Sequence, residues 1–180
     1  AKSMYKDSVQ RFAQETQEIY SENRMVVFLC GPTLKDLTLP AAALRKQIRD
    51  ALIDDGFEVV LGEDDGLEEV RVNTTNAYAH NNELDFIRQE CGAIVIVAGS
   101  PGSFCELGLF VHFIESNNKS QCDIILLVED KFENDKSYFN EGPARAADDF
   151  GKTLFVDFSN CDLNPIVQRL KRRRSSHISM

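Results

Sequence analysis

The chain contains no apolar run long enough to cross a membrane. Its longest apolar runs, Ala93–Ala98 and Ile124–Val128, have the length of a β-strand, whereas a transmembrane helix needs about 18 or more apolar residues. The first residues also lack the basic stretch followed by an apolar stretch that is typical of a secretion signal. We therefore expect a cytoplasmic protein without a membrane anchor.

Cysteine pairs with the spacing of a metal site are missing as well. The five cysteines are odd in number and scattered, and no two are spaced as C-x-x-C. This pattern argues against a structural zinc site and against a disulfide framework. We expect the cysteines to be small buried hydrophobic residues in a reducing compartment, and we expect neither a metal nor a cofactor.

Positive charge is scarce over most of the chain, whose net charge is −9. The segment from Asp54 to Glu69 is strongly acidic, and five of the 20 Lys and Arg residues lie in the stretch Arg169–Arg174. A negative body disfavours general nucleic-acid binding, which depends on cationic surface. The basic stretch could contact a nucleic acid or a partner, but such charge runs are more often solvated.

The order of the elements predicts one α/β domain. A length of 180 residues suits a single core, and predicted strands alternate with helices, which is typical of a doubly wound, mostly parallel sheet of five strands with helices on both faces. We expect an amphipathic helix at residues 1–22, a main domain at 23–160, and a C-terminal helix with a basic tail at 161–180. The predicted strands are Met25–Cys30, Phe57–Leu61, Ala93–Ala98, Asp123–Val128 and Thr153–Phe158, and the predicted helices begin at Pro40, near His80, at Ser103 and at Asn164.

Two loops that follow predicted strands carry small residues. Ligands of doubly wound sheets bind at the carboxyl ends of the strands, which directs attention to the loop Gly99–Ser103 and to Gly31, Pro32 and Thr33. The first loop leads into a helix, whose free amides and dipole favour an anion such as phosphate. Small-residue loops also occur as plain turns. The acidic segment Gly62–Thr75 is long for a simple connection and is typical of a lid or binding segment.

Glu106 has two interpretations. Ser103-x-x-Glu106 matches a capping box, in which the glutamate only binds the backbone at the start of a helix. Alternatively, Glu106 is a carboxylate that faces a sugar, as a nucleophile or as a group that stabilises positive charge at C1′; a place in the first turn would help to keep it ionised. Glu83, beside the buried stripe of its helix, is either a second functional acid or an exposed helical residue.

The span from Met25 to about Val128 resembles the nucleoside 2-deoxyribosyltransferase family and its nucleotide N-hydrolase relatives. The matching segments are Phe28-Leu29-Cys30-Gly31-Pro32, an acid before the third strand at Glu83, and Glu106-Leu107-Gly108. The resemblance implies that Glu106 is the nucleophile, that Glu83 assists at the sugar or base, and that Ser100, Gly102 and Ser103 hold a 5′-phosphate. Ser100 stands where the classical transferases carry an Asp that contacts the base, which favours hydrolysis of a phosphorylated substrate over transfer.

A longer string resembles the deoxyribosyltransferase-like effectors encoded beside retron reverse transcriptases. It comprises Ser100-Pro101-Gly102-Ser103-Phe104-x-Glu106-Leu107-Gly108 and Gly142-Pro143-x-Arg145. This resemblance implies an anti-phage toxin that cleaves NAD or a nucleotide, with Arg145 as a candidate to pair with a phosphate. It also implies a defence-system partner such as a reverse transcriptase–nucleic acid complex, and we expect a homo-oligomer.

The sequence therefore predicts an N-glycosidase that acts on a nucleotide or NAD in phage defence. Three alternatives remain: a Rossmann-like module that senses a nucleotide without cleaving it, a nucleoside deoxyribosyltransferase, and a structural subunit in which the site is idle.

Overall fold

A computed structural model describes residues 24–62, 78–117 and 121–178 of the chain. The helix predicted at 1–22 and nearly all of the predicted acidic loop lie outside the described residues. Strands and helices alternate in the order that the sequence predicts. The elements are β1 (Val26–Cys30), α2 (Pro40–Asp54), β2 (Glu58–Leu61), α4 (Ala79–Glu90), β3 (Cys91–Val97), α5 (Pro101–Asn117), β4 (Asp123–Glu129), η1 (Asp130–Phe132), η2 (Asn140–Ala144), α6 (Arg145–Phe150), β5 (Lys152–Val156) and α7 (Asn164–Ile178).

The five strands form one parallel sheet in the order β2-β1-β3-β4-β5. Strands β3 and β4 are buried almost throughout, because helices cover both faces of the sheet and leave no polar face. The predicted doubly wound α/β fold is confirmed. This strand order is flavodoxin-like, and its sheet changes winding direction between β1 and β3, where ligands of such folds bind.

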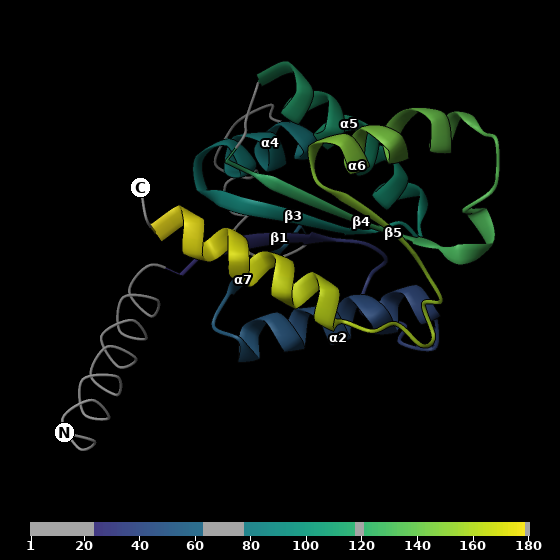
Figure 1. The fold of residues 1–180 in the computed structure, drawn as a ribbon, viewed down its shortest axis with the longest axis horizontal. Coiled ribbons are helices and arrows are strands. Elements are labelled where there is room, and N and C mark those ends of the chain that lie inside the picture. Colours follow the sequence, from purple (N-terminus) through teal and green to yellow (C-terminus); the bar gives the residue numbers. More distant parts are fainter. Residues whose placement is uncertain (1–23, 63–77, 118–120, 179–180) are drawn as a thin grey trace, which may run out of the picture.

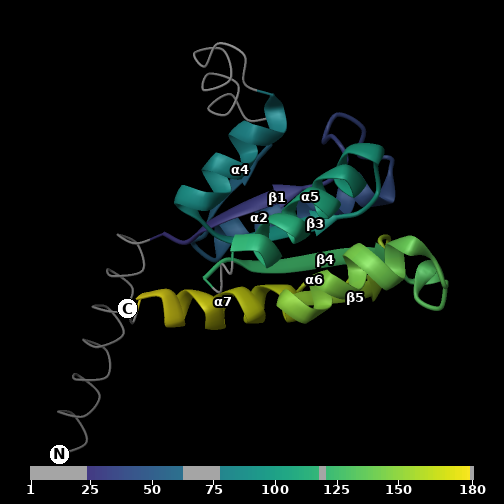
Figure 2. The ribbon, with the colours of Figure 1, turned by 90° about the horizontal axis from the view of Figure 1, so that it is seen from above.

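The helices divide into two layers. Helices α4, α5 and α6 cover one face of the sheet, and α2 and α7 cover the other (Figure 1). Seen from above, α6 lies beside β4 and β5, toward the opposite edge of the sheet from α4 (Figure 2). Alternate residues of each strand therefore enter two separate cores: Phe28 and Cys30 of β1 pack under α4 and α5, whereas Val27 and Leu29 pack against α2.

Helix α7 contains the basic stretch Arg169–Arg174, and the structure does not leave this stretch as a solvated tail. Asp123, fully buried at the start of β4, accepts two hydrogen bonds from Arg169 and one from Arg173. Lys171 pairs with Asp55 at 2.6 Å, and Arg174 stacks on the ring of Phe57. At least four of the five cations thus hold the helix onto the domain, so the expectation of a solvated charge run is wrong.

The cysteines are all free thiols, and Cys30, Cys91 and Cys122 are buried as expected. Cys105 is exposed and Cys161 is half-buried, so the expectation of buried small hydrophobic residues holds for three of the five. No helix in the described ranges combines the length and the apolar character that a membrane span requires.

Candidate active site

The loops that follow β1 and β3 meet at the carboxyl edge of the sheet, because these two strands are neighbours. A methyl group placed on Gly99 would lie 2.5 Å from the Cβ of Ala41 and 3.2 Å from the Cγ of Pro32. The structure thus brings Gly31 and Pro32 together with the predicted loop Gly99–Ser103. Thr33 lies at the exposed end of the first loop. The close contact at Gly99 explains why this position has no side chain.

The start of α5 is capped by a pair of serines. The hydroxyl of Ser100 accepts a hydrogen bond from the amide of Ser103, and the hydroxyl of Ser103 accepts one from the amide of Ser100. This is the reciprocal pattern of a capping box. It lies one turn before the box predicted at Ser103 and Glu106, because the helix begins at Pro101 rather than at Ser103. The capping interpretation of Glu106 is therefore wrong.

The same contacts occupy the amides that were predicted to hold phosphate. The Ser103 hydroxyl also accepts from the amide of Gly99 and donates to the carbonyl of Ser100, and Ser103 is 1% exposed. Ser103 is therefore buried and holds the loop backbone by hydrogen bonds. The phosphate-binding role of this loop stays a prediction, and it now depends on the helix dipole and on Gly102. Gly102 is exposed, and a methyl group added to it would meet no other atom within 4 Å.

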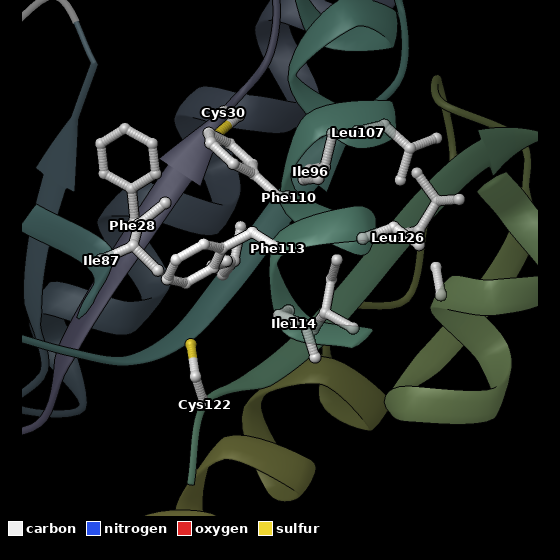
Figure 3. Close-up of a cluster of buried hydrophobic side chains, with 14 of the residues drawn as sticks. Phe28, Cys30, Ile87, Ile96, Leu107, Phe110, Phe113, Ile114, Cys122 and Leu126 are labelled. Carbon is white, nitrogen blue, oxygen red and sulfur yellow. The ribbon is translucent and has the colours of Figure 1, made fainter. Parts of the chain in front are cut away.

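Glu106 lies in the second turn of α5 and is half-buried. One helical turn further on, Phe110 packs edge-on against Phe28 of β1, with ring centroids 5.9 Å apart. Because residues four apart lie on the same side of a helix, Glu106 lies over the end of β1. Figure 3 shows Cys30 and Phe110 together at this end of the strand.

Glu83 reaches the same place from α4. It is half-buried in the first turns of that helix. A methyl group on Gly62, just after β2, would lie 2.9 Å from the Oε1 atom of Glu83 and 3.5 Å from the Cζ atom of Phe28. The carboxylate of Glu83 therefore occupies the space that Gly62 leaves beside the Phe28 ring, and the interpretation of Glu83 as an exposed helical residue is wrong.

The charges of both carboxylates act on the thiol of Cys30. Burial raises the pKa of the Cys30 thiol well above its ordinary value, and the negative charges of Glu106 and Glu83 raise it further. The thiol therefore stays protonated at neutral pH and is no nucleophile. The structure brings the two predicted acids from α4 and α5 into electrostatic range of the last residue of β1.

Arg45 is a site residue that the sequence analysis did not identify. It is 1% exposed and donates hydrogen bonds to the carbonyls of Leu29 and Pro32, at 2.8 and 3.0 Å. A signal was present: Arg45 stands on the apolar stripe of α2 between Ala41 and Ile48, where a charged residue is out of place.

The structure does not bring Arg145 into this group. Arg145, at the start of α6, is exposed and pairs with Glu141 at 3.6 Å. It lines a different cavity, of about 350 Å³, together with residues such as Asn140, Asp148 and Lys152. None of Glu83, Glu106 and the Gly99–Ser103 loop lines that cavity. Its phosphate-binding role stays a prediction, without support from its position.

The two loop glycines are expected to respond oppositely to alanine. Gly99→Ala should lower the free energy of unfolding by about 1–3 kcal/mol, because the new methyl group meets the rigid Cβ of Ala41. Gly102→Ala should leave it unchanged or raise it by about 0.5 kcal/mol, since the space is open and alanine favours the helix. Urea denaturation measures both. Equal losses in the two variants would contradict the observed loop packing.

The fold and this site define a flavodoxin-like α/β domain with two carboxylates gathered at its switch point. The family model of the STM3845 retron effector protein matches residues 43–178, about three quarters of the chain. The chain belongs to this family of retron effectors, which associates it with anti-phage defence. No curated protein matches it.

Proposed function

We propose that the chain is an N-glycosidase that cleaves the base–ribose bond of a nucleotide or of NAD, as the toxic effector of its retron system. One observation carries this proposal. Glu106 and Glu83, which lie on different helices, both lie within electrostatic range of Cys30 at the switch point of the sheet. The capping box predicted for Glu106 does not explain this residue, because Ser100 and Ser103 form the box one turn earlier.

Two carboxylates suit this reaction because positive charge develops on the ribose as the base departs. Glu106 attacks C1′, or stabilises the cationic sugar, while the electron pair of the C1′–N bond leaves with the base. Water then attacks C1′, displaces the Glu106 carboxylate where a glycosyl ester has formed, and loses a proton, which the departing base of a nucleotide takes up. The sugar product is a sugar phosphate from a nucleotide, or ADP-ribose from NAD. Glu83 orients a ribose hydroxyl or assists the water.

The surroundings of the acids strengthen this effect. The floor below them consists of Phe28, the protonated thiol of Cys30 and Phe110, which are all buried. Electrostatic interactions are stronger where water is excluded. A carboxylate held above this floor therefore stabilises a cationic sugar more than the same group would in water.

The direct test is incubation of the purified protein with NAD and, separately, with nucleoside and deoxynucleoside monophosphates. Chromatography should show a free base and the matching ribose product in at least one reaction. Saturable binding with intact ligand would contradict the proposal and identify a nucleotide-sensing module instead.

Hydrolysis is proposed rather than transfer because of Ser100. At the position where classical transferases carry a base-contacting acid, Ser100 caps helix α5. A second free base added to the reaction should therefore leave the products unchanged. Formation of a new nucleotide that carries the added base would show a transferase.

A further inference from the structure

Arg45 is a permanent cation inside the apolar layer between α2 and the sheet. It is among the largest fully buried side chains of the described residues, and its neighbours along α2, Leu44 and Ile48, are buried in the same layer. Burying a charge costs several kcal/mol unless hydrogen bonds compensate the loss of water. The hydrogen bonds of Arg45 therefore help to offset the cost of burying its charge.

Two hydrogen bonds of Arg45 enclose the turn at the end of β1. The Nη2 atom donates to the carbonyl of Leu29 and the Nη1 atom to the carbonyl of Pro32, so the guanidinium joins the residues on either side of Cys30 and Gly31. Gly31 has a φ of +153°, and a methyl group there would lie 3.0 Å from the Cδ of Arg45. The shape of this turn thus depends on Arg45.

Arg45 also acts on the Cys30 thiol, on which the two carboxylates act. Among the charges that affect Cys30, Glu106 and Glu83 raise the pKa of its thiol, as does the Cys91 thiol, whereas Arg45 lowers it. Among the residues that the structure describes, the groups that act on this thiol are Glu106 from α5, Glu83 from α4, Cys91 from β3 and Arg45 from α2. Arg45 is the cation among them.

The helix dipole gives little help in keeping Glu106 ionised. The sequence predicts Glu106 in the first turn of its helix, where the dipole favours a negative charge. The structure places it in the second turn, and the effect of the dipole falls off within the first.

We propose that Arg45 is a positioning residue of the candidate active site. Its guanidinium holds the turn from Leu29 to Pro32 in shape, and its positive charge favours the ionised form of Glu106. The second half of this inference rests on the proposed function, whereas the first half does not.

The test compares Arg45→Lys and Arg45→Met with a control, Arg49→Met. Arg49 lies one turn further along α2 and pairs only with the adjacent, part-exposed Asp50 in the contacts that the structure gives for it. Hydrogen exchange at the amides of Cys30, Gly31 and Thr33 should become about 10-fold faster or more in Arg45→Met, which has no donor. It should also become faster, by a smaller factor, in Arg45→Lys, because an ammonium lacks the rigid fork with which the guanidinium joins the two carbonyls. The control should leave the exchange unchanged.

The charge is tested by the pH dependence of base release. In Arg45→Met the acid limb of the profile should move upward by about half a unit or more, because a nearby cation that favours the carboxylate is gone. Arg45→Lys should return most of this shift while the turn stays loosened. A folded Arg45→Met protein with unchanged exchange and an unchanged profile would overturn the proposal.

Two further measurements distinguish a failure of the proposed function from a failure of the proposal for Arg45. If the wild-type protein releases no base, the proposed function has failed, and titration of the ¹³C-labelled glutamate side chains by NMR then replaces the pH profile for Arg45. If Arg45→Met does not fold, as judged by circular dichroism, Arg45→Lys decides: wild-type exchange rates in its turn amides would overturn the positioning role, and faster exchange would support it.

Discussion

Replacing Glu106 by Gln is expected to reduce base release by roughly a thousandfold or more while the melting temperature stays within about 2 °C of the wild-type value. Gln has the shape of Glu and keeps its hydrogen-bonding oxygen, but it carries no negative charge. It can neither attack C1′ nor stabilise a cationic sugar. The capping box of α5 should be unaffected, because Ser100 and Ser103 form it. The rate of base release and the melting curve are the two measurements.

Glu115→Gln is the matched control, because Glu115 lies on the same helix and is exposed at its far end. This variant should keep both the activity and the melting temperature. An active Glu106→Gln protein would remove Glu106 from the chemistry. A large fall in its melting temperature would instead indicate that the carboxylate is needed for the fold.

The largest effect on stability is expected at Asp123. Its carboxylate is almost fully buried and receives two hydrogen bonds from Arg169, at 2.7 and 2.8 Å. Asp123→Asn should lower the free energy of unfolding by about 3 kcal/mol, because it leaves the partly buried Arg169 without its counter-charge. Since this pair joins α7 to β4, hydrogen exchange in α7 should rise as well. Urea denaturation and exchange measure the two effects.

Asp50→Asn provides the comparison for Asp123→Asn. Asp50 pairs with Lys46 and Arg49 on the surface of α2, and its side chain is 42% exposed. Surface ion pairs contribute at most about 1 kcal/mol, so this variant should lose much less stability. Similar losses at Asp50 and Asp123 would show that burial does not set the strength of these pairs.

In both the candidate site and helix α7, charged side chains that are buried and paired determine the local structure. On α7, buried pairing turns a basic stretch into a structural contact. At the switch point, a buried cation and two carboxylates act on the same thiol. To bind a nucleic acid, these cations would have to be available to pair with phosphates, and the charge run alone does not show whether they are.

The sequence by itself determined the elements of this protein and their class of arrangement. Apolar runs such as Ala93–Ala98 identify buried strands, and Pro40 and Gly56 delimit a helix. These signals are local, because the period of burial follows from the geometry of a single strand or helix. The parallel sheet, and the meeting of the loops after β1 and β3, follow from the alternation of such elements.

Only the tertiary structure decided how the polar groups are paired. A shift of the start of α5 by two residues transferred the capping box from Glu106 to Ser100, and packing against Ala41 explained the glycine at position 99. Arg45 and Asp123 find their partners 16 and 46 residues away along the chain. Such pairings depend on which groups the folded chain removes from water together, and no local pattern of residues records that.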